Sequence, residues 1–139
     1  MDENKITLAN YRILQSKEKI ESAELLLEKG LLGTSLSNSY YSIFHSTRVL
    51  FALEGIDSKS HKGVIHLFNI HFIKTGLLPK NLNSILSSAL EMRFDSDYED
   101  FYVVSKEETE EQLNNAKLFL DSIINFVKLH YDVELKLLH

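Results

Sequence analysis

The sequence has no cysteine and no tryptophan, and only one proline and five glycines in 139 residues. The lack of cysteine excludes disulfides, thiolate metal ligands and cysteine nucleophiles, and it fits a reducing compartment. No apolar run approaches the ~20 residues of a membrane span, and the opening M-D-E-N-K-I-T does not look like a signal peptide. We therefore expect a cytoplasmic protein that has no membrane contact. A net charge of −5 argues against nucleic-acid binding by bulk electrostatics, although a local basic site is compatible with it.

With so few helix breakers, the chain is predicted to be all-α. Residues 34–54 form an uninterrupted segment in which apolar side chains recur every three or four residues, in two rows about 100° apart. Two such rows predict a central helix that is buried on most sides. Serines fill the rest of its circumference, where they let neighbouring helices approach closely and can return their hydroxyls to the i−4 carbonyl. The rows consist of Leu36, Tyr40, Ile43, Thr47 and Leu50, and of Tyr41, Phe44 and Phe51.

Four further segments have helical periodicity: residues 10–29, residues 61–74, a helix from Pro79 to about Arg93, and a helix from the capping box of Ser105 and Glu108 to about Lys128. Residues 129–139 extend the last helix or fray. The polar and aromatic segment 93–104 is predicted to be a linker that packs on the bundle. We thus expect one domain over 1–139 with its core at about 10–128, an antiparallel bundle of four long helices and one short helix.

Three histidines at five-residue steps, His61, His66 and His71, invite comparison with a metal site. On a helix each such step turns the side chain by about 140°, so the three imidazoles cannot converge on one ion. Metal ligands on a helix instead recur at three- or four-residue steps. We predict no metal and no cofactor, and interpret these histidines as solvent-facing or capping. His61, which follows the expected cap Ser60, is retained as a candidate cleft residue.

Arg93 falls on the core-facing stripe of the fourth predicted helix. It follows Leu82 by 11 residues and Leu86 by 7, which places its side chain within about 20° of both. One interpretation is an arginine that balances the helix dipole and pairs with a nearby carboxylate. The other is a guanidinium held at a seam to bind phosphate or another planar anion. The carboxylates closest in sequence are Glu91, Asp95 and Asp97.

Four segments together resemble those of small stand-alone HEPN domains of bacteria and archaea. They are S-N-S-Y-Y-S-I-F-H-S-T-R-V-L-F at 37–51, G-I-D-S-K-S-H-K-G-V-I at 55–65, F-I-K-T-G-L-L-P at 72–79 and R-F-D-S-D-Y at 93–98. The likeness covers roughly residues 12–128. It implies an all-helical bundle, usually a homodimer, often encoded beside a minimal nucleotidyltransferase of the MNT type in a toxin–antitoxin pair. Active members of the family are metal-independent ribonucleases.

The chain departs from the ribonuclease pattern of that family, in which four to six residues separate an arginine from a histidine. The corresponding positions after Arg93 hold Tyr98, Glu99 and Asp100. Metal-free RNA cleavage needs a base, an acid and a cation, and histidine supplies the first two near neutral pH. Phenol and carboxyl groups titrate far from neutrality, so Tyr98 and Asp97 are weak substitutes. The resemblance therefore extends to the fold and leaves catalysis open.

Two functions of different classes follow from this resemblance. The first is a toxin-type ribonuclease with a composite site at a homodimer interface, formed by Arg93, Asp97 and Tyr98 of each subunit. The second is a non-catalytic module in which the same cleft binds a nucleotide or docks an MNT-type nucleotidyltransferase. A third, plainer interpretation is a helical dimer with a structural arginine. The cleft-lining candidates are Tyr40, Tyr41, His61 and Asp95.

Tyr98 is also a candidate for regulation. In the family, a tyrosine near this motif can be adenylylated by the partner nucleotidyltransferase, and Tyr98 closes the matching R-F-D-S-D-Y element. The alternative is that its ring packs on the bundle and its hydroxyl is hydrogen-bonded, as the neighbouring Phe101 and Tyr102 suggest.

Overall fold

The computed structural model describes residues 2–133 and 135, and most of these residues are helical. The described part of the chain has no strand, which confirms the predicted all-α fold. None of its helices is long and apolar enough to cross a membrane. In chain order the elements are α1 (Glu3–Glu28), α2 (Leu32–Glu54), α3 (His61–Phe68), the short π-helix η1 (Asn69–Ile73), α4 (Lys80–Tyr98) and α5 (Lys106–Tyr131).

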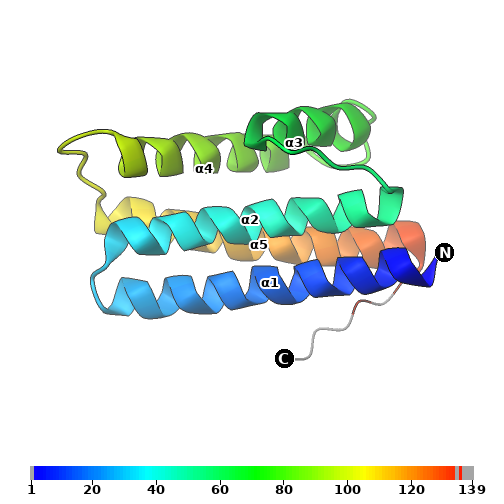
Figure 1. Ribbon diagram of the computed structural model, residues 1–139, viewed down its shortest axis with the longest axis horizontal. Helices are drawn as coiled ribbons and strands as arrows, with labels where there is room; N and C mark the ends of the chain where they lie inside the picture. Colours follow the sequence, from blue (N-terminus) through cyan, green and yellow to red (C-terminus); the bar gives the residue numbers. More distant parts are fainter. Residues whose placement is uncertain (1, 134, 136–139) are drawn as a thin grey trace.

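The helices are arranged around α2 (Figure 1). Helix α1 runs antiparallel along one side of α2, α3 and α4 lie along the opposite side, and α5 packs beside α2. Gly55 ends α2 with a left-handed backbone (φ 69°), and its N–H is donated to the carbonyl of Phe51. The chain then turns back, so that the start of α3 lies over α2.

Helix α2 is the most buried element, as the two apolar rows predict. Burial is nearly complete along the first row, from Leu36 to Leu50, whose side chains are at most 2% exposed. The second row is less buried than expected, because Tyr41 and Phe44 lie partly open near the start of α3. The buried residues of α2 are Ser35, Leu36, Ser39, Tyr40, Ser42, Ile43, Ser46, Thr47, Val49, Leu50, Phe51, Ala52 and Leu53.

Buried serines form a polar seam between α1 and α2. Ser16 Oγ on α1 lies 2.9 Å from Ser42 Oγ and 2.7 Å from Ser46 Oγ. Ser35 donates a hydrogen bond to the carbonyl of Ala23 at 2.7 Å. These hydroxyls therefore join two helices, whereas the sequence pattern predicted bonds within their own helix. Small side chains allow the close approach, and the cross-helix bonds satisfy polar groups that water cannot reach.

Helix α4 is longer than predicted, because it continues through F-D-S-D-Y to Tyr98. That segment has no helix breaker, and two i,i+4 contacts support it: an ion pair between Arg93 and Asp97, and a ring contact between Phe94 and Tyr98. The turn after it does not pack on the bundle as expected, since Phe101 is 100% exposed.

The other helix boundaries also differ from the prediction at several points. Helix α1 begins at Glu3 and not near residue 10, and the predicted helix 61–74 is α3 followed by the π-helical turn η1. Helix α5 extends to Tyr131, beyond Lys128. Of the predicted extension or frayed tail at 129–139, residues 134 and 136–139 lie outside the described residues.

Replacing Phe51 with alanine should lower the free energy of unfolding by about 3–5 kcal/mol, because its ring is completely buried in the core. Phe101→Ala is the matched control: the same atoms are lost from a fully exposed side chain, and the change should stay within ~0.5 kcal/mol. Urea unfolding followed by circular dichroism measures both. Equal effects of the two substitutions would contradict the core described here.

Candidate functional site

Arg93 lies on the face of α4 that also buries Leu82 and Leu86. Its side chain is only 17% exposed. Its guanidinium carbon lies 5.9 Å from the ring centre of Tyr40 and 5.3 Å from that of Tyr41. A cation over aromatic faces is attracted by the ring quadrupole, which partly replaces the water that it has lost. The guanidinium of Arg93 thus packs against the rings of Tyr40 and Tyr41 on α2.

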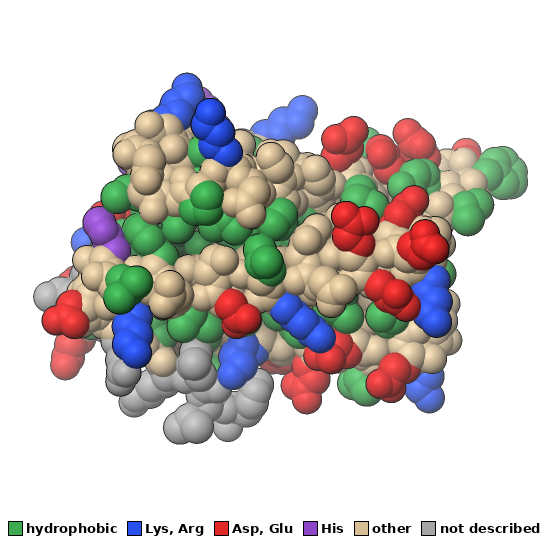
Figure 2. Space-filling view, turned by 180° about the vertical axis from the view of Figure 1, so that it is seen from behind, with side chains coloured by type: hydrophobic (Ala, Val, Ile, Leu, Met, Phe, Trp, Pro, Cys, Tyr) green, Lys and Arg blue, Asp and Glu red, His purple; other side chains and the backbone are tan. Residues whose placement is uncertain are grey.

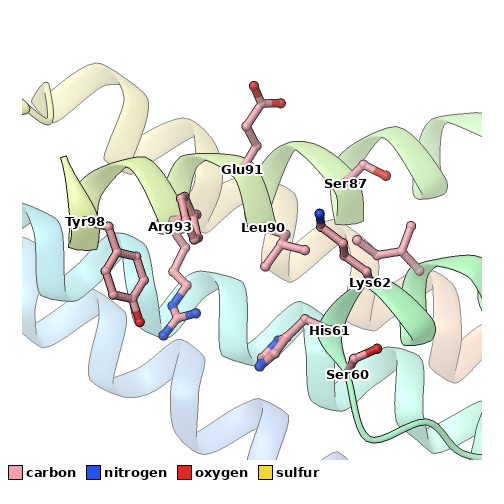
Figure 3. Close-up of a pocket in the computed structure, with 10 residues that line it drawn as sticks. Ser60, His61, Lys62, Ser87, Leu90, Glu91, Arg93 and Tyr98 are labelled. Atoms are coloured by element: carbon pink, nitrogen blue, oxygen red, sulfur yellow. The ribbon is translucent and has the colours of Figure 1, made fainter.

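Asp97 is the carboxylate that pairs with Arg93. Its Oδ2 atom lies 3.1 Å from Arg93 Nε, and this i,i+4 contact exists because α4 continues to Tyr98. The Nε atom is buried and has no hydrogen-bond partner among the described residues, so the contact with Asp97 is electrostatic without being a well-directed hydrogen bond. Of the other two carboxylates proposed from the sequence, Glu91 points away from α2 (Figure 3).

His61 is the first residue of α3. The cap residue Ser60 accepts a hydrogen bond from the Gly63 amide at 2.9 Å and thereby starts the helix. The centre of the His61 ring lies 4.7 Å from that of Phe44 and 5.6 Å from that of Tyr40. The Tyr40 hydroxyl is hydrogen-bonded to His61 Nδ1. The imidazole therefore uses one nitrogen for a buried phenol, which leaves Nε2 as the other hydrogen-bonding atom.

The turn that leads into α3 is tightly packed around Gly63. A Cβ atom at this position would overlap Ser58 Oγ and would lie 2.8 Å from Ser60 Oγ. Only glycine fits here without displacing one or both serines. This packing fixes the start of α3 and, with it, the position of the His61 backbone.

The surroundings of His61 and Tyr40 keep both side chains neutral near pH 7. Burial is the main cause of the lowered pKa of His61, and the positive charge of Arg93 lowers it further. Burial raises the pKa of Tyr40, although Arg93 acts in the opposite direction. The site therefore combines an uncharged imidazole, an uncharged phenol and a guanidinium.

A cavity of about 680 Å³ lies between the start of α3 and α4. Figure 3 shows that Arg93 and His61 both point toward α2, although they come from different helices. Tyr40 and Tyr41 do not line the cavity, but they contact Arg93 and His61 beneath it. The lining residues are Ser60, His61, Lys62, Ile65, Ser87, Leu90, Glu91, Arg93, Phe94 and Tyr98.

Tyr98 lies at the exposed edge of this cavity. Its side chain is 65% exposed, and the centre of its ring lies 4.8 Å from that of Phe94. The remaining residue predicted from the sequence, Asp95, is not among the lining residues. Lys62, which lines the cavity directly after His61, was not predicted from the sequence. Lys62 could have been predicted from its place in the S-H-K-G turn, because that turn also carries the candidate His61.

The cations of the cavity lie in a part of the molecule where acidic side chains are frequent at the surface. Figure 2 shows acidic side chains gathered toward the end that carries the turn between α4 and α5. Arg93 and Lys62 are the basic residues that line the cavity. Attraction of a ligand to this site therefore depends on short-range contacts, since the wider surface does not attract polyanions.

These residues define a class of architecture. It is an all-α bundle in which a buried central helix supports an arginine and a histidine at one cavity. The sequence pattern of the HEPN domain family matches residues 9–127. Because this match covers most of the chain, the chain belongs to the HEPN domain family.

Individual relatives are similar over different lengths. The chain is 45% identical over 65 residues to a UPF0332 protein of Pyrococcus horikoshii, a match that covers 47% of the chain and 46% of that protein. It is 31% identical over 111 residues to a protein of Methanocaldococcus jannaschii named "Putative toxin", covering 79% of the chain and 76% of that protein. A UPF0332 protein of Archaeoglobus fulgidus is 31% identical over 116 residues, which is 84% of the chain and 92% of that protein.

Arg93→Ala should raise the pKa of His61, because the substitution removes a positive charge that opposes protonation of the imidazole. The pKa should stay below the ordinary value of about 6.5, since most of the burial remains. Histidine ring signals followed by NMR between about pH 4 and pH 8 measure this change. Lys106→Ala removes an exposed cation of α5 and is the control. A His61 titration that is the same in Arg93→Ala and wild type would contradict the electrostatic contact.

Proposed function

We propose that the chain is the HEPN-type toxin of a two-gene toxin–antitoxin or defence module, and that its cavity binds a phosphate group of RNA. The observation that carries this proposal is a mostly buried guanidinium, that of Arg93, beside a cavity that also contains His61. Guanidinium groups bind phosphate through paired N–H donors. The name of the Methanocaldococcus jannaschii relative supports the same class.

The proposed reaction is cleavage of RNA without a metal ion. It requires a base for the 2′-hydroxyl, a proton for the leaving oxygen and a cation for the charge that develops on phosphorus. In this proposal Arg93 is the cation and Asp97 orients its guanidinium by pairing with Nε. Tyr98 is a further donor at the edge of the cavity.

The proposed active form is a symmetric homodimer in which two such cavities face a shared cleft. Large apolar side chains near the cavity edge support this arrangement, because exposed apolar groups in one region mark interaction surfaces. Phe94 is 55% exposed, Tyr98 65% and Phe101 100%. Each subunit contributes Arg93, Asp97 and Tyr98 to the composite site.

A second candidate function is a non-catalytic module that binds a nucleotide or docks an MNT-type nucleotidyltransferase at this cavity. Two observations favour it: Arg93 is already paired with Asp97, and acidic side chains gather toward this end of the molecule on the face shown in Figure 2. Both features weaken the binding of a long polyanion such as RNA more than the binding of a single nucleotide or of a basic protein surface. The two functions differ in whether RNA is cut.

Arg93→Ala should abolish both RNA cleavage and the growth inhibition caused by overexpression, while the helical content is retained. The reason is that only the phosphate-binding charge is lost. Arg93→Lys should also be inactive, because an ammonium group cannot reproduce a bidentate contact. Lys106→Ala removes a cation that does not line the cavity and should behave as wild type. Growth curves, cleavage of labelled RNA and circular dichroism measure the three properties.

The same preparations separate the two functions. If wild type and Arg93→Ala are equally harmless and neither cuts any RNA, the ribonuclease function is rejected and the binding module takes its place. Light scattering of these samples tests the dimer, and a monomer at micromolar concentrations would reject the composite site.

Tyr98 is proposed as the residue that a partner nucleotidyltransferase modifies with AMP. Its exposed ring makes the hydroxyl accessible, and the added phosphodiester can pair with Arg93 and block the cavity. Co-expression with an MNT-type nucleotidyltransferase encoded beside the gene should add the mass of AMP to wild type and to the control Tyr102→Phe. Intact-mass measurement should find no such addition in Tyr98→Phe. An added mass that persists in Tyr98→Phe assigns the modification to another residue.

A further inference from the structure

His61 and Arg93 reach one cavity from two helices and rest on the same aromatic pair. Arg93 lies over the rings of Tyr40 and Tyr41. The centre of the His61 ring lies 5.6 Å from that of Tyr40 and 6.3 Å from that of Tyr41. The two side chains are therefore neighbours in space, although 32 positions separate them in the sequence. A histidine next to the arginine is what the segment after Arg93 lacks.

The hydrogen bond to Tyr40 determines which atom of His61 is free. Tyr40 is 1% exposed, and its hydroxyl is bonded to His61 Nδ1. This contact holds the ring in one orientation and leaves Nε2 for a molecule in the cavity, which His61 lines. The start of α3 is fixed by the packing of Gly63 against Ser58 and Ser60. The imidazole is thus positioned from both its backbone and its ring.

We infer that His61 is the general base of this site and that Tyr40 is its positioning residue. This inference rests on the proposed ribonuclease function. In it, His61 of α3 takes the role of the histidine that the family's ribonucleases carry four to six residues beyond the arginine, which this chain lacks. Asp97 is less suited to the role because it is paired with Arg93. Tyr98 is less suited because it lies exposed at the edge of the cavity.

The proton transfers in this step balance. His61 begins with its proton on Nδ1, donated to the Tyr40 oxygen, and with a free lone pair on Nε2. The 2′-hydroxyl of the RNA gives its proton to Nε2 as its oxygen bonds to phosphorus, whose developing charge Arg93 stabilises. The bond from phosphorus to the 5′-oxygen breaks, and this oxygen takes a proton from water. The products are a 2′,3′-cyclic phosphate and a 5′-hydroxyl, and His61 returns its proton to solvent.

The charges around His61 favour a base at neutral pH. The groups that lie near it are Arg93 on α4 and the rings of Tyr40 and Tyr41 on α2, and Lys62 on its own helix also lines the cavity. Of the carboxylates, Glu91 lines the cavity but points away from α2 (Figure 3). Burial and, to a smaller extent, the positive charge of Arg93 lower the pKa of His61, so the imidazole is unprotonated and able to accept a proton.

The test compares His61→Gln, Tyr40→Phe and Arg93→Ala with the control His66→Gln, which alters an exposed histidine of the same helix. Cleavage is measured on labelled oligoribonucleotides. Binding is measured by fluorescence anisotropy with 2′-O-methyl oligonucleotides, which lack the nucleophile. His61→Gln should slow cleavage by on the order of 10²–10⁴-fold and leave binding within about twofold. Arg93→Ala should weaken binding as well, and His66→Gln should match wild type.

The dependence of the rate on pH separates a base from a structural residue. In wild type, kcat should rise with pH and level off once His61 is unprotonated, with an apparent pKa below about 6.5. His61→Gln should lack this rise. Tyr40→Phe should lower kcat by about tenfold, which corresponds to one hydrogen bond, and should shift the midpoint of the rise. Unchanged melting temperatures verify that the variants are folded.

The experiment gives a different result for each way in which the proposed role of His61 can be wrong. If His61→Gln cleaves like wild type while Arg93→Ala does not, the role of His61 is wrong and the proposed function stands. If His61→Gln loses binding in proportion to cleavage, His61 is a binding residue and not the base. If purified wild type cuts no RNA, the ribonuclease function fails, and the role of His61 fails with it.

Discussion

Burial of one helix on most of its sides is the constraint on which the rest of the structure depends. A helix in that position cannot turn a polar face to water, so every hydroxyl that it carries needs a partner within the protein. In α2, Ser42 and Ser46 meet this need by contacting Ser16 on α1, and small side chains are what allow the two helices to come so close. The same helix carries the tyrosines beneath the cavity, so the scaffold and the site are parts of one element.

The site follows from placing a cation against this buried helix. An arginine on a core-facing stripe is costly unless other groups compensate for its lost hydration. Here the faces of Tyr40 and Tyr41 and the carboxylate of Asp97 do so. The compensation is partial, because Arg93 Nε is buried and has no hydrogen-bond partner in the part of the chain that the structure describes. A group held in this way gains more from a bound anion than a fully solvated arginine does, since it gives up less water on binding.

Periodicity predicted the helices well because apolar spacing on a helix is a local property of the sequence. It also placed Arg93 on the face of Leu82 and Leu86, where the structure has it. The end of α4 was missed, since acidic and aromatic residues resemble a linker until their i,i+4 contacts are known. The proximity of His61 to Arg93 could not be derived from periodicity at all. It arises from how α3 folds back over α2, which depends on contacts between segments distant in the sequence.

The residue that fixes the position of His61 has no functional group. Gly63 is packed so closely against Ser58 and Ser60 that even a methyl group would displace the side chains of these serines at the start of α3. A displacement there moves Ser60 and the imidazole of His61 relative to the guanidinium of Arg93, which lies on another helix. The distance between the imidazole of His61 and the guanidinium of Arg93 therefore depends on the steric limit at Gly63. Among related chains, a side chain at this position is a sign that the two groups no longer act together, even where both are still present.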